Sequence, residues 1–249
     1  MKKLFLIKNP DLFQGEKNLT KNKDYFEGWY FKNTNKENGI SFIPGINIED
    51  KVPKAFIQVI TNDSSYFVNY DIKDFKFRTK PFCITIGNNT FSKDGIHIDI
   101  KDKNLNINGD IQYFDDKNIE TSLMNPNIMG PFSYVPFMEC NHAIISMQNK
   151  ANGSLEINNT VINFENDMSY IEKDWGCSFP KNYIWCQGNN FQKSDASFML
   201  SIANVPFKMF NFKGVICVLM TDDKEFKFTT YNNSKIVEYD VNDNSLNIT

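Results

Sequence analysis

The residues best suited to chemistry lie together in one stretch of the second half of the chain. Tyr170, Glu172 and Asp174 alternate with other residues, and Trp175 and Gly176 follow at once. Alternate side chains of a strand point to one face, so Tyr170 and Glu172 should meet there. A carboxyl group in an apolar pocket has its pKa raised by desolvation and can then donate a proton. The stretch predicts an acid–base site. The plainer interpretation is a strand end and a tight turn, with Gly176 in a conformation that other residues avoid.

Glu172 is the expected proton donor, because Tyr170 can hydrogen-bond its carboxyl group and orient the proton. Asp174 is the second choice. It reads as the strand end, where its carboxylate would accept backbone N–H bonds that lower its pKa. His142 lies in an earlier apolar strand and is a candidate to accept or relay a proton. The alternative for His142 is a hydrogen-bonded core histidine.

Aromatic side chains accompany these groups in the segment 25–32 and again just after the acidic stretch. Electron-rich rings stabilise a nearby cation by about 0.5–2 kcal/mol each. We therefore expect His142, Tyr170 and Glu172 to line one cavity together with Trp29 or Tyr30. The expected substrate-binding residues are Glu27, Trp29, Tyr30, Trp175, Trp185 and Gln187.

The elements that must position these residues read as short strands separated by polar turns. The expected strands are 25–32, 40–43, 55–60, 66–72, 82–86, 95–100, 104–114, 137–147, 154–157, 161–164, 197–205, 214–221, 225–231 and 235–241. With no long segment of helical period, the pattern predicts an all-β barrel or sandwich. Asn152 and Gly153 predict a hairpin turn. A segment rich in Pro and Gly at 115–136 predicts two halves, residues 1–120 and 121–249.

Composition excludes several classes of protein. The net charge is −3, with 27 basic and 30 acidic residues well mixed, so nothing marks a surface for nucleic acid or acidic membranes. Five cysteines without metal-ligand spacing and only two histidines argue against a zinc site. Free thiols, an N-terminal apolar run too short for export and the absence of a membrane-length apolar run predict a cytoplasmic protein.

Four motifs, in this order along the chain, resemble the tocopherol cyclase family. They are residues 26–32, residues 130–132, residues 138–142, and residues 170–176 with Phe179-Pro180 and Trp185-x-Gln187. The resemblance implies two lipocalin-like β-barrel halves and acid-catalysed chemistry on a prenyl alkene. In the cyclases a phenol oxygen traps the cation, and in the related carotenoid 1,2-hydratases water does. The histidine and the Tyr-x-acid pair of the hydratases match His142, Tyr170 and Glu172, whereas Ile144 stands where they have Trp.

Two hypotheses follow. The first is a cyclase or isomerase that acts on a prenylated or polyene molecule and needs no metal or other cofactor. The second is a lipocalin-like carrier that binds an apolar ligand without reacting. In a carrier, Glu27, Glu172 and Asp174 would be paired with basic side chains or capped by backbone N–H groups.

Overall fold

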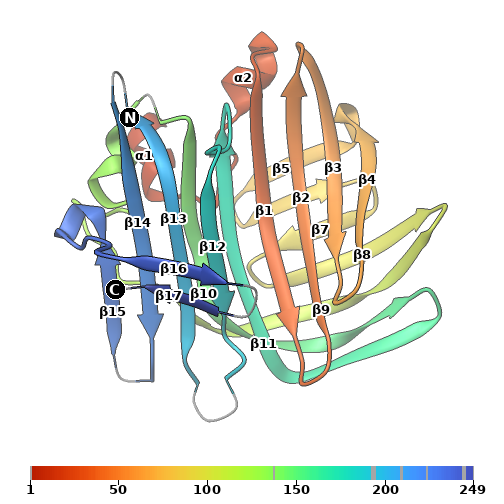
Figure 1. Ribbon diagram of the computed structural model, residues 1–249. Coiled ribbons are helices and arrows are strands. Elements are labelled where there is room, and N and C mark those ends of the chain that lie inside the picture. The colour runs from red at the N-terminus through yellow and green to blue at the C-terminus, as the bar shows by residue number, and fades with distance from the viewer. Residues whose placement is uncertain are drawn as a thin grey trace. The chain divides into compact units, whose positions relative to one another are not determined.

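The computed structural model describes residues 2–136, 138–191, 195–207, 210–222, 224–242 and 245–248. The chain is all-β, as the strand pattern predicted (Figure 1). Helices α1 (Lys2–Lys8) and α2 (Glu16–Lys21) lie in the first 24 residues, ahead of the first expected strand. Their Lys, Leu and Glu residues favour helix, and Lys8 and Lys21 stand in the last turns, where the helix dipole favours a cation.

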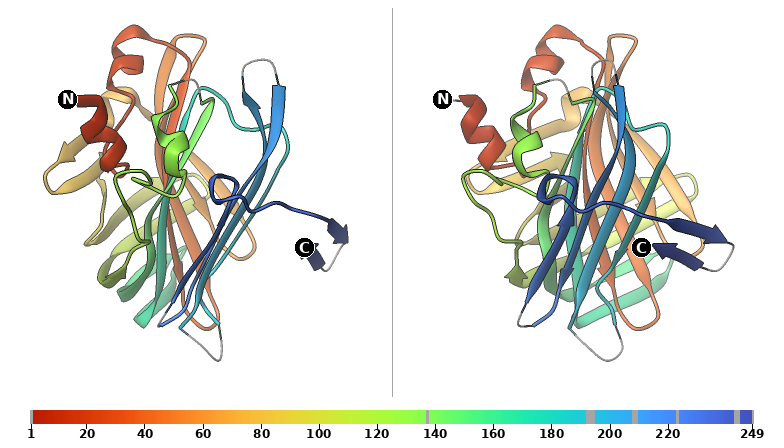
Figure 2. Two further views of the ribbon diagram at one scale, coloured as in Figure 1. Left: turned by 90° about the vertical axis from the view of Figure 1, so that its left-hand side faces the viewer. Right: turned by 60° about the vertical axis from the view of Figure 1, so that its left-hand side comes forward.

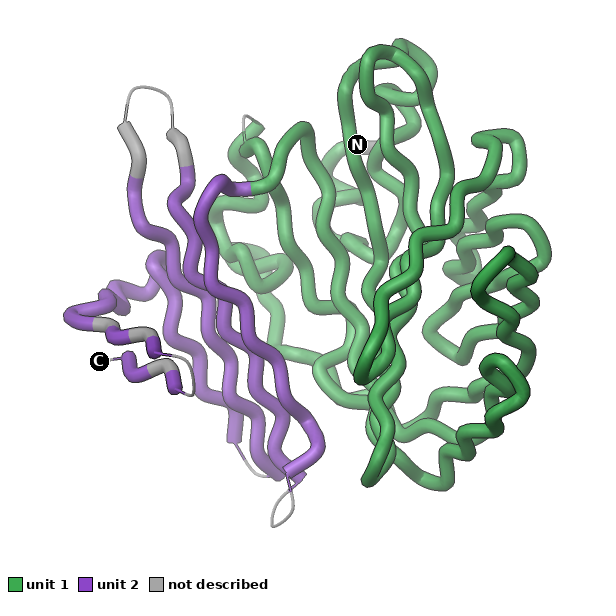
Figure 3. The backbone as a smooth tube through the Cα atoms, turned by 45° about the vertical axis from the view of Figure 1, so that its right-hand side comes forward, with its two compact units in different colours: residues 1–179 green, residues 180–249 purple. Residues whose placement is uncertain are grey.

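The chain divides into two compact units, residues 1–179 and 180–249 (Figure 3). This division lies later than the boundary expected at 120/121. The reason is the pairing of two strands that follow that boundary. β10 (Cys140–Ile157) pairs with β9, and β11 (Thr160–Gly176) pairs with β1, so both complete the sheet of the first unit.

The first unit is an antiparallel sheet of 11 strands in the order β4-β3-β2-β1-β11-β10-β9-β8-β7-β6-β5. The remaining strands are β1 (Tyr25–Thr34), β2 (Gly39–Glu49), β3 (Val52–Ile60), β4 (Ser65–Asp71), β5 (Phe75–Thr79), β6 (Phe82–Ile86), β7 (Asn89–Ser92), β8 (Gly95–Asp102) and β9 (Leu105–Lys117). Two 3-10 turns, η1 (Ile72–Asp74) and η2 (Gly130–Tyr134), lie between strands. β2 runs through Pro44 and Gly45, where the sequence predicted a break.

The large sheet bends so that strands β5 to β8 face β1 to β3 (Figure 2). Phe91 on β7 contacts the rings of Phe31 on β1 and Phe42 on β2, at centroid distances of 5.4 and 6.4 Å. All three rings are fully buried. One face of the sheet therefore encloses the core of this unit, and the other face is turned away from it.

The hairpin expected at Asn152 and Gly153 lies elsewhere. Both residues are inside β10, and the turn between β10 and β11 is at Asn158 and Asn159, whose φ angles are 49° and 70°. Asparagine tolerates this left-handed conformation, which two-residue hairpins require. Gly153 serves a close approach of strands instead, since a Cβ atom there would lie 2.1 Å from the Asp110 carbonyl oxygen.

The second unit contains a four-stranded sheet in the order β12-β13-β14-β15. Its strands are β12 (Tyr183–Gly188), β13 (Ser197–Phe207), β14 (Phe210–Met220) and β15 (Glu225–Thr229), followed by the 3-10 turn η3 (Thr230–Asn232) and a hairpin of β16 (Tyr239–Asn242) and β17 (Ser245–Ile248). Leu200, Ile202 and Val215 form its small apolar cluster.

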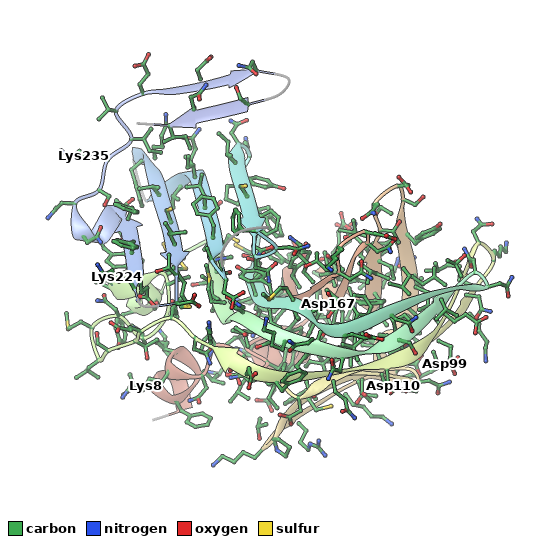
Figure 4. The ribbon with its side chains drawn as sticks, turned by 90° about the horizontal axis from the view of Figure 1, so that it is seen from below. Lys8, Asp99, Asp110, Asp167, Lys224 and Lys235 are labelled. Atoms are coloured by element: carbon green, nitrogen blue, oxygen red, sulfur yellow. The ribbon has the colours of Figure 1, made fainter. Side chains whose placement is uncertain are left out.

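The side chain of His97 is 44% exposed, and its Nδ1 lies 2.8 Å from Oδ1 of Asp110, which Figure 4 labels on β9. All five cysteines are free. Within the described residues, no helix is long and apolar enough to cross a membrane.

Candidate active site

The candidate site is built on three neighbouring strands, β1, β11 and β10. Tyr30 is paired with Glu172 across β1 and β11, and His142 is paired with Asp174 across β10 and β11. Directly paired residues of an antiparallel sheet point to the same face. The sheet thus brings Tyr30, His142, Tyr170, Glu172 and Asp174 to one face, which we call the site face. The opposite face, which carries the core, is the core face.

His142 lies at the centre of a chain of polar contacts. Its Nδ1 lies 2.9 Å from Oδ1 of Asp174, and its Nε2 lies 3.7 Å from Oε2 of Glu172. The Tyr170 hydroxyl donates to the same Glu172 oxygen at 2.6 Å. An ionised carboxylate only accepts, so Nδ1 carries a hydrogen toward Asp174. Nε2 is buried and makes no hydrogen bond within the described part of the chain, although it forms the 3.7 Å ion pair with Glu172.

The charges around His142 favour its protonated form. Burial lowers the pKa of His142, but the carboxylates of Asp174 and Glu172 outweigh burial and raise that pKa to about 9. The side chain of His142 is only 12% exposed, so water screens these interactions weakly. At neutral pH the imidazolium therefore holds a proton between two acids.

This pKa shift predicts how stability depends on pH. The folded-state pKa of about 9 lies above the usual 6.5, so protonated His142 stabilises the fold fully below pH 6.5. That contribution, about 3 kcal/mol for a shift of this size, should be lost as pH rises through 9. We expect urea unfolding of the wild type to show this fall in the free energy of unfolding between pH 6.5 and 9.5.

The chain contains a matched control for this experiment, since it has only two histidines. His142→Gln should flatten the decline, whereas His97→Gln, which changes an exposed ring, should leave it intact. An unchanged pH profile in His142→Gln would contradict the assigned charge state.

His142, Glu172 and Asp174 together have the residue types of a divalent cation site. The ligand atoms of His142, Glu172 and Asp174 all lie within 4.8 Å of one another. A metal would have to displace the imidazolium proton, because only neutral imidazole binds metal. We therefore expect Zn²⁺ or Mg²⁺ at pH 7 to leave the melting temperature unchanged. A rise in melting temperature that His142→Gln abolishes would instead establish a metal site.

Tyr30 borders the same cluster. The Ser41 hydroxyl donates to the Tyr30 hydroxyl at 3.0 Å, and the ring centroids of Tyr30 and Tyr170 are 6.4 Å apart. Burial raises the pKa of Tyr30 to about 12, with Ser41 opposing the rise and Glu172 adding to it. Tyr30 therefore stays a neutral hydrogen-bond donor. Sequence reasoning missed Ser41, since only the pairing of β1 with β2 brings it here.

Glu27, Trp29 and Trp175 lie on the core face and do not border His142. Lys173 Nζ lies 2.5 Å from Glu27 Oε1, and both side chains are fully buried. The ammonium group lies 4.7 Å from the centroid of the Trp29 ring and 4.8 Å from that of Trp175. Of the two aromatic partners expected for the site, Tyr30 is present and Trp29 is on the other side of the sheet.

The core-face ion pair also fastens the segment that precedes β1. The Lys173 ammonium donates to the carbonyl oxygens of Pro10 and Leu12 at 2.8 and 2.6 Å. Glu27 accepts the backbone N–H groups of Gln14 and Gly15. The Glu27–Lys173 pair thus binds backbone groups of the segment before β1 and holds that segment against the sheet.

The roles expected of Asp174 and Gly176 need correction. β11 continues to Gly176, so Asp174 shares the face of Glu172 and bonds His142 instead of turn N–H groups. The φ angle of Gly176 is not positive, so its backbone is not in a conformation that other residues avoid. Glycine is required here for a steric reason, because a Cβ atom would lie 1.9 Å from the Glu139 carbonyl oxygen.

Trp185 and Gln187 lie on β12, in the second unit. The Trp185 side chain is 37% exposed. Their expected part in substrate binding remains a prediction.

Fold and site together define a lipocalin-like all-β protein with a buried polar cluster on three neighbouring strands, β1, β10 and β11. The family model described as tocopherol cyclase-like matches residues 117–242, just over half of the chain. The chain therefore belongs to the tocopherol cyclase-like family.

Relatives are distant. The rice (Oryza sativa subsp. japonica) protein named "Probable tocopherol cyclase, chloroplastic" is 34% identical over 74 residues, which are 30% of this chain and 16% of the rice protein. A candidate AttH of Nitrosomonas europaea has a TM-score of 0.52 at 9% identity, over 84% of this chain and 69% of its own. CghA has a TM-score of 0.50 at 9% identity, over 81% of this chain and 59% of its own. At such identities the two structures show the fold alone.

Proposed function

We propose that the protein is a cofactor-independent cyclase or isomerase that protonates an alkene of a prenylated or polyene small molecule. The observation that carries this proposal is the contact chain from Tyr170 through Glu172 and His142 to Asp174, in which Nε2 of His142 faces Glu172 without a hydrogen bond. Such a chain can give up one proton and regain another, as a cyclisation requires.

In the proposed reaction Glu172 is the proton donor. Its carboxyl proton forms a C–H bond with one alkene carbon and leaves a tertiary carbocation at the other. A hydroxyl oxygen of the same substrate then forms a C–O bond with that carbon and loses its proton. His142, with Tyr170 beside it, returns that proton to Glu172, so the substrate is isomerised and the enzyme ends as it began.

An apolar substrate helps to create the acid. Without substrate, the shared proton resides on His142, since the pKa of His142 is about 9. When an apolar substrate displaces water from the cluster, desolvation disfavours the ion pair relative to two neutral groups. The proton of Nε2 then passes to Glu172, next to the alkene.

Two similar proteins support this proposal. The rice relative is named for a cyclase, although the similarity covers 16% of its length. CghA, of like fold, has been solved with the small molecule Sch210972. A small organic substrate is therefore compatible with the fold.

The proposal is tested by incubating the protein in D₂O with a panel of prenylated hydroquinones. Each cyclised product should carry one carbon-bound deuterium, because the transferred proton comes from exchangeable sites of the enzyme. Mass spectrometry should find a product one mass unit above the substrate measured in H₂O. Absence of deuterated product for every compound, despite tight binding, would favour a carrier.

The pairing of the acidic residues bears on the carrier hypothesis. Glu27 is paired with Lys173 and capped by backbone N–H groups, as a carrier would require. Glu172 and Asp174 are likewise paired with a basic side chain, His142, which a carrier would allow. An imidazole between two acids can in addition transfer a proton, which the cyclase hypothesis requires.

We also propose a cytoplasmic location. All five cysteines are free, as expected in a reducing compartment. The chloroplast named for the rice relative is a property of that protein.

A further inference from the structure

A row of residues crosses the site face beside the proton-transfer cluster. Asp174 on β11 is paired with Gly28 on β1, Gly28 with Gly45 on β2, and Gly45 with Phe56 on β3. Three strand spacings separate Asp174 from Phe56, a span of about 14 Å. Two adjacent glycines leave this span without side chains of its own.

The ring of Phe56 covers part of this bare backbone. A Cβ atom on Gly45 would lie 2.6 Å from Cζ of Phe56, and one on Gly28 would lie 4.0 Å from the same atom. The ring therefore lies over Gly45 and reaches toward Gly28, where an added Cβ atom would also lie 3.2 Å from Cγ2 of Ile43. A side chain at Gly45 would meet both this ring and the Glu27 carbonyl oxygen, each 2.6 Å from its Cβ atom, so Gly45 is required for the position of the ring.

Further aromatic rings extend this surface. Phe67 on β4 stacks on Phe56 at a centroid distance of 4.9 Å and is 54% exposed. At the other end, Phe26 on β1 stacks on Phe179 at 4.5 Å. We define the aromatic platform as Phe26, Ile43, Phe56 and Phe67 with Gly28 and Gly45.

The chemistry of the aromatic platform suits an isoprenoid or polyene chain. Its side chains are apolar although they lie on the face turned away from the core, and they are half-buried or exposed. Its inner end meets Asp174, which holds the ring of His142. Aromatic faces also stabilise a carbocation. Trp29 and Trp175 contact Lys173 on the core face, so the rings that could serve this purpose are those of the site face, among them Phe56 and Tyr30.

We propose that the aromatic platform binds the apolar chain of the substrate, with Phe56 against the chain and the reacting alkene at the end next to His142 and Glu172. This inference rests on the proposed function and adds to it the surface that binds the apolar chain of the substrate and the direction in which that chain lies. The chain crosses the strands from β11 toward β3 and β4.

All-trans-retinol is a suitable probe, since it is an isoprenoid polyene whose fluorescence rises in an apolar site. We expect saturable binding by the wild type and a Kd about tenfold higher in Phe56→Ala, because a buried aromatic contact is lost. Phe56→Leu, which remains apolar and is the milder change should Phe56→Ala fail to fold, should weaken binding less. Gly28→Ala should also raise the Kd, by placing a methyl group between Phe56 and Asp174.

The control is Phe77→Ala, which removes an exposed ring from β5, at the far edge of the sheet. It should bind retinol as the wild type does. No saturable retinol binding by the wild type, or equal Kd values for the wild type and a folded Phe56→Ala, would overturn the proposal.

A different variant tests the proposed function independently of the aromatic platform. His142→Gln should bind retinol normally and lose deuterium incorporation. If deuterium incorporation is intact while Phe56→Ala leaves the Kd unchanged, the aromatic platform is refuted and the proposed function stands.

Discussion

Replacing Glu172 by glutamine is expected to lower kcat by about 10²- to 10⁴-fold, the usual contribution of a general acid. Glutamine has the size of glutamate and still offers an oxygen to the Tyr170 hydroxyl, which now donates to Glu172 at 2.6 Å. It lacks an acidic proton. Retinol binding and the melting temperature should therefore remain close to wild type, and turnover of an identified substrate should be almost lost.

Asp174→Asn is the matched comparison for Glu172→Gln, because it also exchanges one acid of the cluster for its amide. The carboxylate of Asp174 helps to hold the pKa of His142 at about 9. Its loss should lower that pKa and move the alkaline limb of the pH–rate profile to lower pH, with activity retained. If Glu172→Gln stays active and a folded Asp174→Asn is inactive, the two roles must be exchanged. If both stay active, His142 is the next candidate for the donor.

Lys173→Met should destabilise the first unit by about 3–5 kcal/mol, the cost of leaving one buried charge without its partner. Glu27 and Lys173 are both fully buried, 2.5 Å apart. Burial lowers the pKa of Lys173 and Glu27 opposes that fall. Urea unfolding at pH 7 measures the loss. Because two carbonyl oxygens also lose their donor, Pro10 and Leu12 should be released from the sheet.

The double variant Lys173→Met/Glu27→Gln should recover part of this loss, since no unpaired charge remains. Lys101→Met is the surface control. Its pair with Asp99, at 3.2 Å, has a lysine side chain that is 76% exposed. Such pairs contribute about 0–1 kcal/mol. A loss in Lys173→Met no greater than that in Lys101→Met would show that the buried pair is not a major stabilising interaction.

Strand alternation predicted part of this site. It placed Tyr170 with Glu172, and it placed Trp29 and Tyr30 on opposite faces of one strand. Which face carries the chemistry depends on long-range pairing, and alternation does not report it. The sequence therefore offered Trp29 and Tyr30 as equal alternatives, and only the register of β1 with β11 selects Tyr30.

The remaining parts of the site depend on residues that look ordinary in sequence. Lys173 stands between two acids and reads as a solvent-exposed charge, yet it is buried. Phe56 reads as one more strand residue, and its position over Gly45 follows from a pairing of β2 with β3. Asp174 was expected at a strand end because Trp175 and Gly176 resemble a turn. The strand continues there because Gly176 lets the Glu139 carbonyl approach.

The place of β1 beside β11 also has a consequence for folding during synthesis. Paired residues of the two strands lie 134 to 150 positions apart along the chain. At about 5–20 residues per second, roughly 7–30 s therefore pass between the synthesis of a β1 residue and that of its partner on β11. Until then the backbone groups on one edge of β1 lack their partner strand, and Glu27 lacks its ion-pair partner Lys173. Non-local pairing of this kind slows folding and exposes edges to aggregation. Chaperone demand should therefore be concentrated in the interval before Lys173 is synthesised.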